Sequence, residues 1–177
     1  MPDEIEKKYL IREGAEECIT DEFKLKFYSI DYIAREILKE GEKIRQGYLD
    51  LGKGSDLAKM LNIDIGFEIM EARLRDKAGK FYFTLKGDGT LSRSELEKEI
   101  DSGLFNEYWP ETGGKRLEKC RLKKPYHEYE AEFDLYLDRN LIIAEVEVPS
   151  IEDALKLLPL GKDVTDDKRY KNKNLAR

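Results

Sequence analysis

The sequence EIEKKYLI carries two carboxylates and an ammonium group at alternate positions, in Glu4, Glu6 and Lys8. In a β-strand the two-residue period places all three on one face. Carboxylate pairs at this spacing, with roots about 7 Å apart, suit a hard cation such as Mg²⁺ or Mn²⁺. Glu145 and Glu147 form a second such pair. Two cysteines and one histidine cannot supply a Zn²⁺ site of the usual kind, so the chemistry predicted here is that of oxygen ligands.

Basic side chains show the same alternation in other segments, and charge sorts by segment. The basic segments EARLR, TLK and EKCR contrast with the acidic segments EAEFD and AEVEV. Arginine can bind phosphate oxygens in a bidentate manner, so the basic segments suit a polyphosphate. The Gly-containing stretch KGDG lacks the remaining spacing of a Walker loop. Phosphate binding is therefore expected to use side chains.

An antiparallel sheet with one face in water would also explain the alternation. Such faces usually mix Thr, Ser and Gln with the charges, whereas these faces are almost entirely charged. If the sheet closes around them, eight strands can enclose a lumen that holds one small ligand. Like charges in a lumen would repel unless an anion lay on the basic wall and a divalent cation on the acidic wall.

About eight strands must position these side chains. They are predicted in EIEKKYLI, IRQGYLDL, FEIMEARLRDK, FYFTLKGDG, SRSELEKEI, KRLEKCRLKK, YEAEFDLYL and LIIAEVEVP. Because no strand-helix-strand alternation or repeat is present, we predict an α+β fold dominated by antiparallel sheet. The length of 177 residues predicts one domain over residues 1–177.

Helices are predicted in three places. Apolar residues recur at helical spacing within Glu13–Glu42, where Asp31 is the expected N-cap and Gly41 the expected end. Shorter helices are expected after Asp101 and after Ser150. The stretch GKGSD is predicted to be a turn.

Composition narrows the class of protein. Charged residues make up 40% of the chain, and the net charge is -6. An acidic balance argues against a general nucleic-acid binder. The sequence shows no apolar run of about twenty residues and no leader with a basic and then an apolar region. We therefore expect a cytoplasmic protein with neither a membrane nor a nucleic acid as partner.

Taken in order, these motifs resemble the CYTH superfamily, also called triphosphate tunnel metalloenzymes. EIEKKYLI matches its ExExK signature, and the motifs that follow in the family's order cover most of the chain: QGYL, EARLR, TLKGDGTLSRSELEKEI, EKCR, EFDLYL, IIAEVEV and DVTDDKRYKNKNLA. QGYL and the last motif resemble the bacterial short-chain inorganic tripolyphosphatases most. The resemblance implies a closed eight-stranded antiparallel β-barrel with flanking helices, and metal-dependent hydrolysis of a triphosphate, chiefly inorganic tripolyphosphate.

The resemblance also implies roles for individual residues. Lys8 and Tyr48 would be the catalytic pair that orients the attacking water. Mg²⁺ or Mn²⁺ would be held by Glu4, Glu6, Glu132, Asp134, Glu145 and Glu147. Phosphate oxygens would be bound by Arg73, Arg75, Lys86, Arg93, Lys119, Arg121 and Arg169.

The stretch between Ile11 and Gln46 is longer than in the compact triphosphatases, and its charged helix could cover a tunnel mouth or mediate contacts in a homodimer. Substrate choice therefore stays open. A class IV-type adenylate cyclase is the first alternative, because the same tunnel can hold ATP with its 3′-hydroxyl as nucleophile. A thiamine triphosphatase and a non-catalytic protein that binds polyphosphate or nucleotide are the others.

Overall fold

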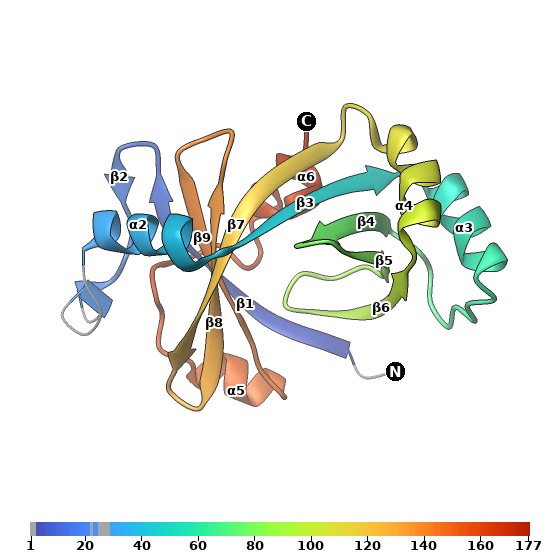
Figure 1. Cartoon of the computed structure of the whole chain (residues 1–177). Helices are drawn as coiled ribbons and strands as arrows, with labels where there is room; N and C mark the ends of the chain where they lie inside the picture. Colours follow the sequence, from blue (N-terminus) through green and yellow to red (C-terminus); the bar gives the residue numbers. More distant parts are fainter. Residues whose placement is uncertain (1–2, 22, 25–28) are drawn as a thin grey trace. The chain divides into compact units, whose positions relative to one another are not determined.

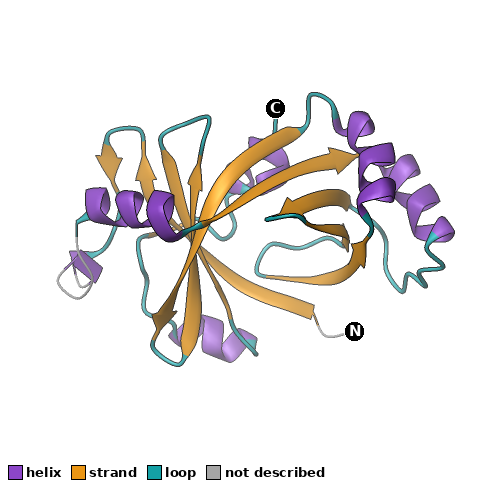
Figure 2. Cartoon of the chain, in the orientation of Figure 1, coloured by secondary structure: helices purple, strands orange, loops and turns teal. Residues whose placement is uncertain are grey.

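The computed structural model describes residues 3–21, 23–24 and 29–177 (Figure 1). The eight strands of at least seven residues in this described part are β1 (Asp3–Glu13), β3 (Glu42–Leu49), β4 (Glu71–Lys77), β5 (Lys80–Lys86), β6 (Ser92–Ile100), β7 (Arg116–Tyr126), β8 (Tyr129–Tyr136) and β9 (Leu141–Glu147). The two-residue strands β2 (Glu16–Glu17) and β10 (Lys162–Asp163) pair with β1. Each of the eight strand-forming segments predicted from the alternation overlaps one long strand. Figure 2 shows the strands in orange.

The strands are hydrogen-bonded in the order β10-β1-β6-β5-β4-β3-β7-β8-β9, and β1 also pairs with β9. The order is therefore cyclic, which is the strand connectivity of a closed antiparallel β-barrel. Together with the flanking helices, this confirms the predicted fold class.

The chain divides into two compact units. Unit 1 comprises Met1–Glu4, Ile44–Leu117 and Arg169–Arg177, and unit 2 comprises Ile5–Lys43 and Glu118–Lys168. The single domain over residues 1–177 stays a prediction.

In unit 1, strands β3 to β6 form antiparallel neighbours with one apolar and one polar face. The apolar face packs against α3 (Leu51–Met60) and α4 (Ser102–Tyr108) in a core that contains Leu57, Ala72, Leu74, Phe83, Leu85 and Phe105. The 3₁₀ helix η1 (Trp109–Thr112) follows α4, and η2 (Lys168–Tyr170) and α6 (Asn172–Leu175) lie near the C-terminus. Asp101 caps α4 as predicted, because its side chain accepts a hydrogen bond from the Leu104 amide. Since side chains alternate along a strand, this packing commits the charged positions to the opposite face.

The predicted turn at GKGSD is wrong, because these residues belong to α3. The two glycines suggested a turn, but Gly54 serves close packing instead. A Cβ atom at this position would lie 2.3 Å from the Cβ of Ala72 on β4. Glycine therefore allows the helix backbone to approach the strand.

In unit 2, the antiparallel neighbours are β1, β9, β8 and β7. Helix α2 (Ile30–Glu40) packs on β8, and its buried residues include Ile33 and Ile37. The buried apolar residues of these strands include Ala131, Phe133, Ile142, Ala144 and Val146. Strand β1 contains a bulge, because Leu10 pairs with Ile143 and Arg12 with Ile142, which leaves Ile11 as the extra residue.

The helix expected within Glu13–Glu42 is shorter than that range and has a different cap. Strand β1 continues to Glu13, and α2 begins only at Ile30. The Oγ of Ser29, rather than Asp31, accepts the hydrogen bond from the Tyr32 amide, at 3.4 Å. Asp31 lies in the first turn of α2 and pairs with Arg12. The predicted end at Gly41 is confirmed.

Helix α5 (Ile151–Lys156) is the third predicted helix. Its N-cap is Ser150, as expected, because the Oγ of this residue accepts a hydrogen bond from the Asp153 amide at 3.1 Å. No helix in the described part of the chain is both long enough and apolar enough to cross a membrane.

Candidate active site

The polar face of unit 1 consists of rows of side chains that cross its strands. The antiparallel register places Tyr48 opposite Arg73, Arg73 opposite Thr84, and Thr84 opposite Glu97. A neighbouring row contains Glu71, Lys86 and Glu95, and the row on the other side contains Gln46, Arg75, Tyr82 and Glu99. Residues distant in sequence are therefore brought together by register.

Glu97 is shared by two guanidinium groups. Arg75 Nη2 donates to both of its carboxylate oxygens, at 2.9 and 3.1 Å. Arg73 Nη2 lies 3.6 Å from Glu97 Oε2 and donates to Thr84 Oγ1 at 3.2 Å. Burial alone would lower the pKa of Arg73, but Tyr48, Glu71 and the other nearby carboxylates raise it above its ordinary value. Arg73 is therefore a permanent cation.

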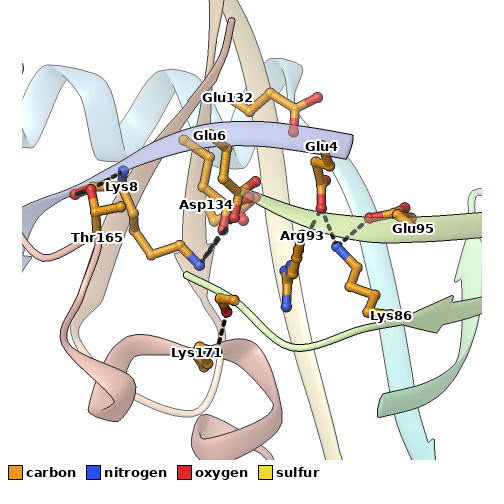
Figure 3. A network of polar contacts seen from close by, with 12 residues as sticks. Glu4, Glu6, Lys8, Lys86, Arg93, Glu95, Glu132, Asp134, Thr165 and Lys171 are labelled. Atoms are coloured by element: carbon orange, nitrogen blue, oxygen red, sulfur yellow. Dashed lines mark hydrogen bonds and ion pairs between the residues drawn. The ribbon is translucent and has the colours of Figure 1, made fainter. Parts of the chain in front are cut away.

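Glu4 is likewise shared between two cations (Figure 3). Lys86 Nζ lies 2.8 Å from Glu4 Oε2 and 2.5 Å from Glu95 Oε2. Arg93 Nε lies 3.5 Å from Glu4 Oε2, and its Nη1 lies 3.8 Å from Glu71 Oε2. Lys86 is 3% exposed, so these charges interact with little screening by water.

Tyr48 is buried at the end of its row, and it contacts a second buried side chain of β3. Gln46 Nε2 donates a hydrogen bond to Tyr48 Oη at 2.6 Å. Burial raises the pKa of the Tyr48 hydroxyl well above its ordinary value, and Glu71 adds to this effect. Tyr48 therefore keeps its proton and can donate it in a hydrogen bond.

The polar face of unit 2 begins with Lys8. Its Nζ lies 2.9 Å from Glu145 Oε1 and 3.7 Å from Glu6 Oε1. The main chain of Lys8 is also held, because its amide donates to Thr165 Oγ1 at 3.1 Å. The ammonium group thus lies between two of the predicted metal ligands.

Arg121 is the centre of the rest of this face. It donates to Asp134 at 2.7 and 2.6 Å, to Glu145 at 2.8 Å, and also to Glu132. Burial alone would raise the pKa of Glu145, but Lys8, Lys119 and Arg121 hold it well below its ordinary value. One guanidinium group therefore donates hydrogen bonds to three carboxylates.

Lys119 and Asp134 are the most deeply buried charges of this face, at 1% and 0% exposure. Lys119 Nζ donates to Asp134 Oδ2 at 2.5 Å. Burial, and secondly the charge of Arg121, lowers the pKa of Lys119 to about 8. Its positive charge is therefore lost at a lower pH than that of an ordinary lysine.

Unit 2 also contains pairs of like charges in direct register. Glu6 lies opposite Glu147 across β1 and β9, and Glu132 lies opposite Glu145 across β8 and β9. Like charges directly opposite one another destabilise a sheet. A divalent cation would relieve this repulsion, and carboxylate oxygens are the donors that Mg²⁺ and Mn²⁺ favour, so the residues fit such an ion. In the described part of the chain, no three Asp, Glu, His or Cys side chains are already gathered as a complete metal site.

The two remaining predicted residues, Glu147 and Arg169, are both exposed. Glu147 is exposed near the end of β9. Arg169 is exposed on η2, with its guanidinium carbon 5.5 Å from the centroid of the Tyr170 ring. In the same tail, Lys171 Nζ donates to the Gly89 carbonyl at 2.7 Å.

Some residues of the polar faces have no role predicted from the sequence. In unit 1 they are Gln46, Glu71, Thr84, Glu95 and Glu97, and in unit 2 Thr165. Glu71 and Thr84 belong to the segments EARLR and TLK, and Glu95 and Glu97 to the predicted strand SRSELEKEI, but only the register shows which residues lie opposite one another. Lys8 and Tyr48, the predicted catalytic pair, belong to different units.

Comparison with known proteins identifies two inorganic triphosphatases as relatives of this chain. No protein-family profile matches the sequence. The inorganic triphosphatase of Nitrosomonas europaea is 37% identical over 139 residues, which cover 75% of this chain and 83% of the relative. The inorganic triphosphatase of Acetivibrio thermocellus is 35% identical over 146 residues, which cover 79% of this chain and 83% of the relative.

Solved structures show the same similarity. The crystal structure of the inorganic triphosphatase NE1496 matches with a TM-score of 0.56 and 28% identity, over 99% of this chain and 95% of that one. A putative adenylate cyclase from Bacillus halodurans shares the fold, with a TM-score of 0.51 at 15% identity over 95% of this chain and all of that one. With two relatives above one third identity over most of its length, and with the ExExK signature on β1, this chain belongs to the inorganic triphosphatase family of the CYTH superfamily.

Proposed function

We propose that this protein hydrolyses inorganic tripolyphosphate to pyrophosphate and orthophosphate, with a divalent cation as cofactor. Family membership supports the reaction class. The observation that carries the proposal is the polar face of unit 1, where four cations lie on three neighbouring strands, with Arg73 and Lys86 buried. These cations, Arg73, Arg75, Lys86 and Arg93, are paired with Glu4, Glu71, Glu95 and Glu97. An extended polyanion is the ligand that would give these cations further partners.

The anion would be bound by side chains alone. Guanidinium groups present parallel N–H donors that match the oxygens of a phosphate group. Arg73 and Arg75 lie two residues apart on β4, and Lys86 follows on β5, so their donors are spread along the sheet rather than focused at one point. This spacing suits successive phosphate groups better than a single orthophosphate.

Carboxylates of unit 2 would hold Mg²⁺ or Mn²⁺. The bound ion would supply charge neutralisation at phosphate oxygens and a water of lowered pKa. The register brings like charges together in two pairs, so these side chains would gain most from a cation: Glu6 with Glu147, and Glu132 with Glu145.

Lys8 and Tyr48 would act on the attacking water. Phosphoryl transfer needs little covalent participation by the protein, and most of its acceleration comes from positioning and charge. Lys8 supplies a positive charge held between Glu145 and Glu6, and Tyr48 supplies a hydroxyl donor that stays protonated. We propose that orienting the water for in-line attack is the role of these groups, as the family resemblance implies.

A substrate panel tests this function. The purified protein is offered tripolyphosphate, ATP and thiamine triphosphate, with Mg²⁺, with Mn²⁺ or with a chelator, and orthophosphate, pyrophosphate and cyclic AMP are measured. We expect orthophosphate and pyrophosphate from tripolyphosphate, and none with the chelator. Cyclic AMP from ATP without tripolyphosphate hydrolysis would assign a cyclase instead, and tight binding of all three without products would assign a binding protein.

The substitution Glu6→Gln tests the metal role directly. The amide keeps the shape of the side chain but removes the negative oxygen, so kcat with Mg²⁺ should fall by about 100-fold or more, while the protein stays folded. Glu118→Gln is the matched control, because Glu118 is exposed and pairs with Lys43 at 3.1 Å. Full activity of the Glu6→Gln protein would exclude Glu6 as a metal ligand.

A further inference from the structure

Gln46 lies two residues before Tyr48 on β3, on the same face and fully buried, at 0% exposure. It belongs to the QGYL motif, yet neither the sequence nor the resemblance gives it a role. The register places it opposite Arg75, next to the row that contains Tyr48 and Arg73. Its side chain is therefore part of the polar face of unit 1 rather than of the apolar core.

The hydrogen bond between Gln46 and Tyr48 has a defined direction. The amide nitrogen Nε2 has hydrogens and no available lone pair, so it can only donate, and Tyr48 Oη accepts at 2.6 Å. The phenol proton of Tyr48 must therefore point away from Gln46. Arg73, directly opposite Tyr48, is a donor and cannot take this proton. The proton is left for an acceptor such as a carboxylate, a phosphate oxygen or a water.

A merely structural role explains Gln46 poorly. Its Oε1 is buried and has no hydrogen-bond partner among the described residues. A buried acceptor without a partner costs about 1–3 kcal/mol, so an apolar side chain of similar size would give a more stable strand. This cost in stability is explained if the hydrogen bond from the Gln46 amide to Tyr48 has a role in function.

We infer that Gln46 is a positioning residue, whose amide fixes the Tyr48 hydroxyl as the acceptor of one hydrogen bond and so presents its O–H to the reacting water or phosphate. This inference rests on the proposed function, in which Tyr48 acts on that water. Gln46 itself touches Tyr48 and works through it. The expected signature is an effect on kcat that disappears when the Tyr48 hydroxyl is absent.

Kinetics of four proteins test this signature: wild type, Gln46→Met, Tyr48→Phe and the double variant. Methionine keeps the length of the side chain and removes the donor. We expect kcat of Gln46→Met on tripolyphosphate to fall by about 10- to 100-fold, the range typical of lost orienting contacts, with KM changed by less than about threefold. In the Tyr48→Phe background the same substitution should have no further effect on kcat.

Thr112→Val is the matched control for a general disturbance of β3. A Cβ atom on Gly47, between Gln46 and Tyr48, would lie 2.5 Å from Thr112 Oγ1, so Thr112 contacts the opposite face of the same strand. Thr112 Oγ1 also donates to the Trp109 carbonyl at 2.7 Å. This variant should lose stability while keeping kcat. A kcat loss in Thr112→Val equal to that in Gln46→Met would overturn the inference.

A readout without turnover separates this inference from the proposed function. The ¹³Cζ resonance of Tyr48, identified as the tyrosine signal missing from Tyr48→Phe, reports the hydrogen bond that the hydroxyl accepts. It should shift in Gln46→Met and stay in place in Thr112→Val. Either an unchanged resonance or an unchanged kcat in Gln46→Met would refute the positioning role. If the wild-type protein were inactive on tripolyphosphate, the proposed function and the kinetic role of Gln46 would both be rejected. The resonance would still show whether Gln46 donates a hydrogen bond to Tyr48.

Discussion

In unit 1 one carboxylate is divided between two cations, whereas in unit 2 one guanidinium is divided among three carboxylates. Glu97 serves Arg73 and Arg75, and Arg121 serves Glu132, Asp134 and Glu145. Both faces are strands of the same sheet with the same alternation. In unit 1, however, Lys86 and Arg93 are also each shared between two carboxylates. The difference therefore teaches that neighbouring arginines on one strand, β4, suit an anion, whereas carboxylates in direct register in unit 2 suit a cation.

Replacing Arg121 should have the largest effect, a loss of stability in unit 2. Arg121→Met leaves Asp134, which is fully buried, and two other carboxylates without their common partner. Loss of one partner of a buried ion pair costs about 3–5 kcal/mol, so the free energy of unfolding in urea should fall by that amount. Mn²⁺ should restore part of the loss, because a divalent cation can take the place of the guanidinium.

Lys156→Met is the control for this prediction, because its exposed pair with Glu152 at 2.6 Å lies on α5. Exposed pairs contribute about 0.2–1 kcal/mol. If Arg121→Met were no more costly than Lys156→Met, the carboxylates of unit 2 would not depend on a shared cation.

Removing the shared carboxylate of unit 1 should have the opposite effect on binding. Glu97→Gln releases Arg73 and Arg75 from their common negative charge. Tripolyphosphate should then bind about tenfold more tightly, equivalent to about 1.4 kcal/mol, when measured by calorimetry with a chelator present to prevent turnover.

Glu99→Gln is the matched control on the same strand, since Glu99 is exposed like Glu97 but lies opposite Tyr82. The affinity of this variant for tripolyphosphate should stay within about twofold of the wild type, because the ion pairs whose loss releases Arg73 and Arg75 are those of Glu97. Weaker binding by Glu97→Gln would show that Glu97 orients the guanidinium groups rather than competing with the anion.

The smallest effect concerns pH and Lys119. Burial lowers the pKa of Lys119 from its ordinary 10.5 to about 8, in contact with Asp134 and near Arg121 and Glu145. Between these two pH values the unfolded chain binds more protons than the folded one, so this residue makes stability rise with pH. The stability of wild type minus that of Lys119→Met, measured by urea unfolding in chelator from pH 7.5 to 10, should increase by at most about 1.4 kcal/mol per pH unit. A difference that stayed flat or fell would contradict the lowered pKa.

The strands were predictable because each bears charge on one face and apolar side chains on the other. EARLR and YEAEFDLY show this period without interruption, and they form β4 and β8. The caps at Asp101 and Ser150 were predictable for a similarly local reason, since a short acceptor precedes each helix. Local signals of this kind survive folding because tertiary contacts support them.

What the sequence could not provide depends on contacts between distant segments. The glycines of α3 predicted a turn, because the sequence does not show that Ala72 packs against Gly54. The start of α2 was misplaced because Ser29 and Asp31 are both good caps, and Arg12 on β1 attracts Asp31. The charged residues of the site were found by alternation and by the family resemblance, but the register decides that Glu97 meets Arg73 and Arg75, and that Gln46 contacts Tyr48. Their roles in catalysis stay predictions.

The bulge in β1 has a consequence for how this strand can change during evolution. An inserted residue reverses the facing of every side chain beyond it. In β1 the extra residue is Ile11, past Lys8, so the frame of the ExExK signature is left intact. An insertion or deletion between Glu4 and Lys8 would turn part of the signature to the opposite face. Homologous chains should therefore vary in length freely after Ile11 and hardly at all before it.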